Sequence, residues 1–272
     1  MSFLTGKITK MSVELTNPVT YHFHLGEEKI LANSLLGEKI RFRFTGEIRC
    51  IQCDRKISKS FQQGFCFPCF KRLNECNLCN IHPEKCRFYE GVCNNDDWAH
   101  AHCGKEHAVY LANSSGIKVG ITRNSHIPSR WIDQGASQGL VIARVQNRYQ
   151  SGLVEVAIKQ YVADKTNWRA MLKSENSIQN LTSKREELLT LAKSKLSPIL
   201  ERFSDDIQFV SSEEATRIHY PILEYPKKIT TFDLDKNPVV EGTLLGLKGQ
   251  YLILDTGVIL VRKFAGYCLQ WG

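Results

Sequence analysis

Hydrophobic and polar positions follow different periods along the chain. In residues 39–45 apolar side chains alternate with arginine and threonine, which places the two sets on opposite faces of a strand. Strand-like apolar runs recur at 19–25, 239–245, 250–255 and 258–264. Residues 174–205 instead carry an apolar stripe at helical spacing, with Pro198 as a predicted break or kink. The pattern predicts an α+β fold whose β-rich N- and C-terminal parts can meet in a small barrel.

The middle of the chain combines both periods within a short stretch. Two predicted strands, Ala108–Ala112 and Ile117–Thr122, flank a Ser-Ser-Gly turn, and a short helix begins near residue 129. A third strand is expected at Leu140–Val145, followed by a helix from Gly152 to Val162 with one apolar face. This order predicts a small α/β module.

These changes of pattern divide the chain into five predicted segments. They are N-terminal β-strands at 1–49, a cysteine-rich zinc-binding module at 50–107, the small α/β module at 108–173, a helical region at 174–205 and a β-rich unit at 206–272.

The composition is that of an ordinary folded protein with a basic surface. The formal net charge is +8 and the pI about 8.9, and residues 108–173 hold nine Lys and Arg against three Asp and Glu. Such a surplus favours a polyanionic partner, so we expect binding to DNA or RNA that weakens as salt rises. No run reaches the roughly 18 apolar residues of a membrane span, and the N-terminus lacks the features of a secretory signal. We therefore expect a cytoplasmic protein.

Nine of the ten cysteines fall within residues 50–107. In a reducing compartment such density indicates metal ligands rather than disulfides. Cys50-x2-Cys53 is followed after twelve residues by Cys66-x2-Cys69, and two such pairs complete a tetrahedral four-thiolate shell that is closed to substrate. The spacing predicts a structural zinc site.

A second set of candidate ligands comprises Cys76, Cys79, Cys86, Cys93, Cys103 and His107. The first four could form one site, leaving Cys103 and His107 over. Alternatively, Cys76 and Cys79 pair with Cys103 and His107, which we expect on one side of a helical turn, while Cys86 and Cys93 hold another ion with nearby histidines. The spacing does not choose between these groupings, so we expect one to three Zn²⁺ ions.

The α/β module resembles the GIY-YIG nuclease superfamily in its order of elements and in two short motifs. Residues 108–110, Ala-Val-Tyr, stand where the first motif is found, and residues 118–120, Lys-Val-Gly, where the second is found. The arginine of the superfamily falls on Arg130 and its metal-binding glutamate on Glu155. Ala108 replaces the first glycine and Lys118 the second tyrosine. The whole chain is also similar to a bacterial family of unknown function in which a cysteine cluster runs into VYLANSSG, KVGIT and RWIDQGA.

The superfamily resemblance implies hydrolysis of phosphodiester bonds in DNA or RNA with one divalent metal ion. It implies that Glu155 binds Mg²⁺ or Mn²⁺ and that Arg130 neutralises charge on the phosphate. Tyr110, or a water that it orients, would be the general base, and Lys118 would supply an electrostatic contact.

Two other functions fit the same composition. The first is a non-catalytic zinc-containing protein that binds nucleic acid, for which binding survives Glu155→Ala. The second is a protein–protein adaptor, for which no affinity for polynucleotide is expected even at low salt.

Overall fold

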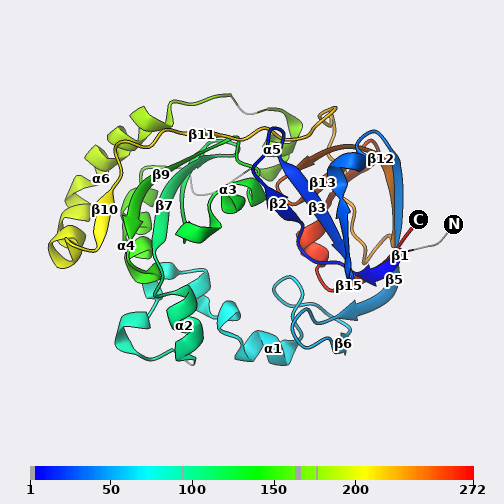
Figure 1. The fold of residues 1–272 in the computed structure, drawn as a ribbon, viewed down its shortest axis with the longest axis horizontal. Helices are drawn as coiled ribbons and strands as arrows, with labels where there is room; N and C mark the ends of the chain where they lie inside the picture. Colours follow the sequence, from blue (N-terminus) through cyan, green and yellow to red (C-terminus); the bar gives the residue numbers. More distant parts are fainter. Residues whose placement is uncertain (1–3, 94, 163–166, 176) are drawn as a thin grey trace.

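The computed structural model describes residues 4–93, 95–162, 167–175 and 177–272. Its parts are arranged as a ring around a central opening (Figure 1). A β-rich unit built from both ends of the chain forms one side, and a sheet covered by helices forms the opposite side. The cysteine-rich segment runs between them and completes the ring.

The β-rich unit contains a seven-stranded sheet in which the two ends of the chain pair. Its strands, in spatial order, are β1 (Leu4–Lys7), β15 (Tyr267–Trp271), β5 (Lys39–Arg49), β12 (Val239–Lys248), β13 (Tyr251–Leu254) and β14 (Gly257–Leu260), with β6 (Lys56–Ile57) beside β5. All these pairings are antiparallel. The predicted meeting of N- and C-terminal strands is therefore confirmed.

A second, three-stranded sheet packs on one face of the seven-stranded sheet. It consists of β2 (Ser12–Glu14), β3 (Thr20–Leu25) and β4 (Glu28–Leu31). Phe23 of β3 packs on Phe42 and Trp271, with ring centroids 6.4 and 5.1 Å away. The prediction of a small barrel is wrong: within the described residues the strand path runs from β1 to β14 without closing. The apolar face of β5 is buried by a second sheet instead of by closure.

The central sheet has the order β10 (Ile207–Phe209), β9 (Gln138–Val145), β7 (His107–Asn113) and β8 (Ile117–Arg123), with β11 (Thr216–Arg217) also paired to β9. Alternate residues of β7 face opposite sides because side chains along a strand have a period of two. Val109 and Leu111 pack against the helices that cover one face. Ala108, Tyr110 and Ala112 belong to the core shared with the β-rich unit.

The described helices are α1 (Phe67–Arg72), α2 (Asp96–His102), α3 (Ser129–Asp133), α4 (Arg148–Lys159), α5 (Trp168–Lys173) and α6 (Leu181–Phe203), besides short 3-10 turns such as η4 (Pro83–Lys85) and η7 (Val261–Phe264). Helix α4 begins four residues before the predicted Gly152, because the Asn147 side chain caps it by accepting the N–H of Gln150 at 3.1 Å. Helix α6 continues through Pro198, whose exposed position lets water reach the backbone carbonyl that loses its partner. None of the helices in the described ranges is long and apolar enough to cross a bilayer.

Candidate functional site

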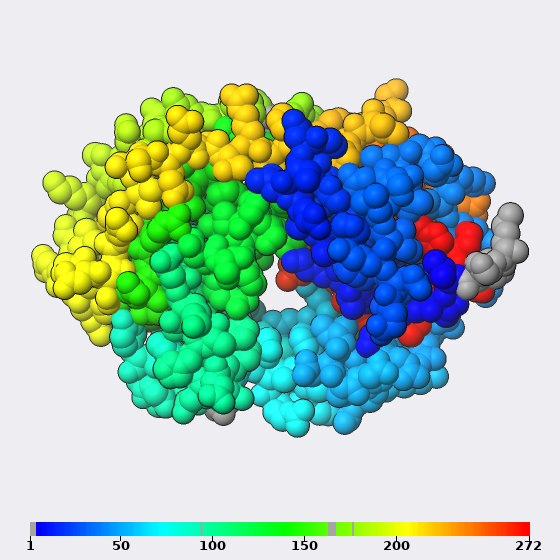
Figure 2. Space-filling view, in the orientation of Figure 1, coloured from blue at the N-terminus to red at the C-terminus, as the bar shows by residue number. Residues whose placement is uncertain are grey.

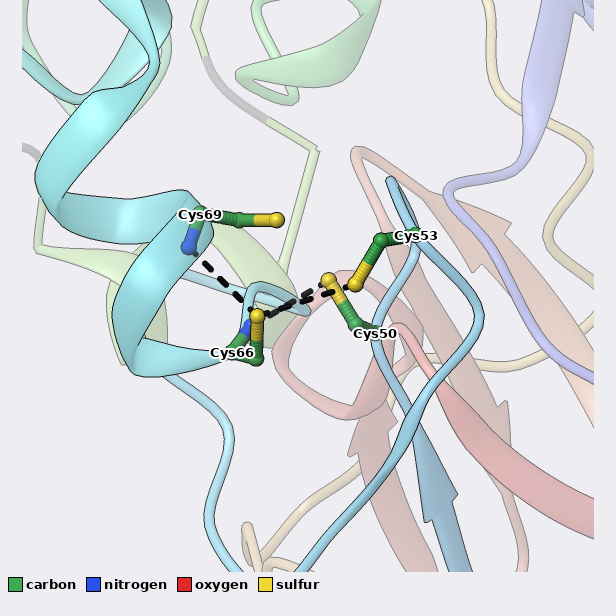
Figure 3. Close-up of side chains that lie close together, drawn as sticks. All are labelled: Cys50, Cys53, Cys66 and Cys69. Carbon is green, nitrogen blue, oxygen red and sulfur yellow. Dashed lines mark hydrogen bonds between the residues drawn. The ribbon is translucent and has the colours of Figure 1, made fainter.

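Four cysteines from two turns of the chain meet at one point between the β-rich unit and helix α1 (Figure 3). Cys50 follows strand β5, and Cys53 lies in the turn after it. Cys66 is the N-cap of α1, where its Sγ accepts the N–H of Cys69 at 3.4 Å, and Pro68 stands in the first turn of that helix. The local sequence Cys-Phe-Pro-Cys therefore both starts the helix and turns two thiols inward.

The geometry of this four-cysteine cluster suits a zinc ion. All four Sγ atoms lie within 4.8 Å of one another, and the Sγ atoms of Cys53 and Cys66 are 3.8 Å apart. Tetrahedral zinc with Zn–S bonds of about 2.3 Å places its sulfur atoms about 3.8 Å apart. All four thiols are free of disulfides. Among the described residues, the cluster can hold a metal ion as the spacing predicted.

Backbone N–H groups favour thiolates in this cluster. Burial raises the pKa of Cys50, but bonds from the backbone of Cys53, Cys66 and Gln52 outweigh it and the pKa falls to about 6. Burial and the neighbouring thiols raise the pKa of Cys69 to about 12. Four thiols this close cannot all ionise unless a cation balances their charge, which is the condition that a structural zinc ion fulfils.

The second set of predicted ligands is divided by the fold. Cys86 and Cys103 are hydrogen-bonded through their thiols, and Cys79 and Cys93 lie close enough to act electrostatically on Cys86 or be acted on by it. Cys76 is influenced by Cys50, on the side of the first cluster. The grouping of these ligands around an ion therefore stays a prediction.

His107 takes a different place from the one expected. Cys103 is the C-cap of α2, while His107 is the first residue of β7, so the two do not share a helical turn. The Nδ1 of His107 donates to the carbonyl oxygen of Lys105 at 2.7 Å, and its buried Nε2 has no hydrogen-bond partner among the residues that the structure describes. Burial, with the nearby arginines, lowers its pKa to about 4, so the ring stays neutral and presents Nε2 as an acceptor.

A cavity of about 660 Å³ opens between the central sheet, the cysteine-rich segment and the β-rich unit. Its lining comes from α2, β7, β8, α3, α4 and η7, and Figure 2 shows an opening in the surface between the two sides of the ring. Tyr110, Lys118, Arg130 and Glu155, the four residues carried over from the nuclease resemblance, all line it. They come from four elements, β7, β8, α3 and α4, which the fold brings around one cavity.

Tyr110 is held in this wall by close packing and two hydrogen bonds. Its hydroxyl donates to Oε1 of Gln134 at 3.3 Å and accepts from the guanidinium of Arg130. Its ring lies over Gly120 of β8, the residue opposite in the ladder, where a Cβ would stand 2.8 Å from both Cζ and the hydroxyl oxygen. Burial raises the pKa of Tyr110 although Arg130 and Gln134 oppose the shift, so the phenol is neutral. Glycine in the second motif is thus required by Tyr110.

Further basic residues, beyond the four carried over from the resemblance, line the same cavity. Burial, and then the guanidinium of Arg148, lower the pKa of Arg123. Burial, and then the guanidinium of Arg130, lower the pKa of Arg262, which comes from η7 in the β-rich unit. Arg148 donates to the carbonyl oxygens of Cys79 and Asn80, which fixes its position without neutralising it. Pairs of like charges this close favour a bound anion.

Sequence signals for these residues were weak. The basic surplus of residues 108–173 pointed to the region but not to Arg123 or Arg148 individually. Arg262 lies far along the chain and reaches the cavity only because the β-rich unit closes the ring.

The fold and the site define a mixed α+β protein with a four-cysteine cluster that can bind a metal ion. Residues 37–269 match the model of a family described as protein of unknown function DUF2797. Because the match spans most of the 272 residues, the chain belongs to this family. Comparisons with curated proteins and with solved structures gave no match.

Proposed function

We propose that this protein is a zinc-stabilised phosphodiesterase that cleaves nucleic acid with the help of a divalent metal ion. The observation that carries the proposal is the convergence of Tyr110, Lys118, Arg130 and Glu155 on one basic cavity. Tyr110, Arg130 and Glu155 are the types of side chain that the resemblance to GIY-YIG nucleases implies, and Lys118 stands where the second tyrosine is found. The cavity is also lined by other arginines, as a site for a polyanion requires.

Each of the four side chains has a distinct task in the proposed reaction. Arg130 binds the scissile phosphate and neutralises the charge that develops on it. Tyr110 is neutral at rest, so its hydroxyl orients the attacking water rather than taking its proton at the outset. Lys118 contributes positive charge beside the phosphate. The carboxylate of Glu155 would hold Mg²⁺ or Mn²⁺, hard ions that prefer oxygen ligands, and such an ion supplies stabilisation of charge on the leaving oxygen.

Cleavage of labelled DNA and RNA tests the proposal. Purified protein should cut a labelled substrate only when Mg²⁺ or Mn²⁺ is added, and Glu155→Gln and Arg130→Gln should each reduce the rate at least 100-fold. Arg217→Gln, which removes an exposed positive charge outside the cavity lining, is the matched control and should keep the wild-type rate. Equal trace cleavage by wild type and Glu155→Gln would show contamination and refute catalysis. If neither the wild type nor Glu155→Gln cleaves nucleic acid but both bind it, the protein is a non-catalytic nucleic-acid-binding protein.

We also propose a second zinc ion at Cys79, Cys86, Cys93 and Cys103. This grouping is supported by the Cys86–Cys103 thiol contact and by the electrostatic effects among Cys79, Cys86 and Cys93, although among the described residues only the first cluster has its ligand atoms within 4.8 Å of one another. The position is well anchored, because Gly152 of α4 lets the backbone of η4 approach so closely that a Cβ there would lie 2.3 Å from the Glu84 nitrogen. The first cluster and this second group would together hold two ions per chain.

A further inference from the structure

The dimensions of the cavity limit what it can hold. Its volume of about 660 Å³ equals that of a cube with an edge of about 9 Å. The major groove of B-DNA alone is about 12 Å wide, so a duplex cannot enter the cavity and can only lie across its open mouth. Clefts of roughly 300–1,000 Å³ bind single small molecules, which is the scale of one or two nucleotides. The cavity therefore fits an unpaired strand.

Two aromatic rings stand in the wall of the cavity that the cysteine-rich segment provides. Trp98 and His102 lie one turn apart on α2, with ring centroids 4.2 Å apart and planes at 6°. Both are half-buried and both line the cavity. Trp98 donates from Nε1 to Glu75 at 3.1 Å, and Nδ1 of His102 donates to the carbonyl oxygen of Trp98 at 2.9 Å. The two rings stack face to face, so a base can extend the stack only on an outer face of the pair, in the way that bases stack on aromatic side chains.

A second cluster of positive charge lies away from the proposed scissile phosphate. On β8, Arg123 is three residues beyond Gly120, so its side chain leaves the strand on the face opposite to the one that meets Tyr110, yet both residues line the cavity. Arg148 at the start of α4 acts directly on Arg123, and its guanidinium is held by backbone carbonyls. A phosphate bound here would be distinct from the scissile one and would lie in the same cavity.

We propose that the cavity binds an unpaired strand of DNA or RNA, with one phosphate at Arg130, a flanking phosphate at Arg123 and Arg148, and a base stacked on Trp98 and His102. This inference rests on the proposed function, because it takes the phosphate at Arg130 to be the scissile one. It adds the substrate class: a single-stranded segment, a free end or a splayed junction arm is bound, and a continuous duplex is not.

Fluorescence anisotropy tests the inference with the full chain carrying Glu155→Gln, which removes cleavage from the measurement. The probes are a labelled 12-nucleotide single-stranded DNA, the RNA of the same sequence, and a blunt hairpin duplex. We expect both single strands to bind at least 10-fold more tightly than the hairpin, and a preference between the two single strands identifies the natural sugar. Equal affinity for the hairpin overturns the inference.

Further substitutions in the same background test the stacked base. Trp98→Ala should weaken binding of the single strands about 5- to 100-fold, the effect of losing one stacked base, while Trp98→Phe should retain most of the affinity. His102→Ala gives an independent measurement if Trp98→Ala does not fold, as judged by circular dichroism. Unchanged affinity in the folded Trp98→Ala variant, or in His102→Ala when the former is unfolded, overturns the inference.

The flanking phosphate is tested by salt dependence. Arg123→Gln should weaken binding of single strands and reduce the slope of log affinity against log salt by about one, whereas Arg217→Gln outside the cavity should leave the slope unchanged. An unchanged slope for Arg123→Gln would show that Arg123 contacts no phosphate, and it overturns the inference. If single strands bind as described but wild type never cleaves them, catalysis fails and this inference stands. If wild type cleaves duplex and single strand equally, catalysis stands and this inference fails.

Discussion

Substitution of Gly120 by alanine perturbs the site at one well-defined point. The added Cβ would lie 2.8 Å from Cζ and from the hydroxyl oxygen of Tyr110, closer than any normal contact of that type. Tyr110 cannot retreat easily, because it is completely buried and packs edge-on against Trp131 with ring centroids 6.0 Å apart. The backbone of Gly120 lies outside the left-handed region, so alanine brings no backbone strain of its own.

Two opposing effects set the size of the change. Replacing glycine by alanine at a compatible backbone position stabilises a protein by about 0.4–1 kcal/mol through the unfolded chain. Forcing one extra carbon into a packed core costs about 1–3 kcal/mol. We therefore expect Gly120→Ala to lower the free energy of unfolding by about 1–2 kcal/mol, with a drop in Tm of about 3–6 °C.

Urea denaturation and nucleic-acid cleavage measure the two consequences. In a Tyr110→Phe background the hydroxyl oxygen is absent but Cζ remains, so Gly120→Ala should cost less there than in the wild type without becoming neutral. Cleavage should fall with Gly120→Ala alone, because Tyr110 is displaced from Arg130. A Gly120→Ala protein that is as stable as wild type and equally active would refute the packing of Tyr110 on Gly120.

Two further predictions concern metal content and pH. Elemental analysis should find two zinc ions per chain. One ion should be lost in Cys86→Ser, whereas Cys76→Ser should keep both. Loss of an ion in Cys76→Ser would contradict the proposed second site at Cys79, Cys86, Cys93 and Cys103. Burial lowers the pKa of His107 from 6.5 to about 4, so between these values the unfolded chain binds more protons than the folded one and stability falls as the pH is lowered. Between pH 7 and pH 5 the wild type should therefore lose about 2 kcal/mol that His107→Gln does not lose, and equal losses in urea titrations would contradict this account.

Local patterns sufficed for the elements and residues whose determinants are close in sequence. The β-branched and aromatic residues and the turn residues around 108–123 predicted strands β7 and β8 nearly to the residue. Likewise, the spacing of Cys50, Cys53, Cys66 and Cys69 was enough to predict their cluster, because each pair needs only one tight turn.

The second cysteine set shows where spacing fails. Cys76-x2-Cys79 has the same spacing as the first two pairs, yet the two thiols go to different places. Asn74, Asn77 and Asn80 lie in and beside this pair of cysteines. The Asn77 side chain donates to that of Asn74 at 3.2 Å, and the backbone of Asn77 is extended. Such local bonds compete with the turn that would bring the thiols together, and a spacing rule does not register them.

Metal binding and nucleic-acid binding are expected to be coupled through the wall that the cysteine-rich segment gives to the cavity. This segment has little core of its own: around the first cluster, three buried cysteines pack with only Ile57, Phe65 and Leu73. Zinc binding can supply on the order of 10 kcal/mol to such a segment. Trp98 and His102 lie in this segment, whereas Tyr110 and Arg130 belong to the central sheet and its helix, which have a separate core. Removal of zinc should therefore abolish binding of single strands while the central sheet stays folded. If the central sheet also unfolds when zinc is removed, the metal stabilises the whole ring and this account is wrong.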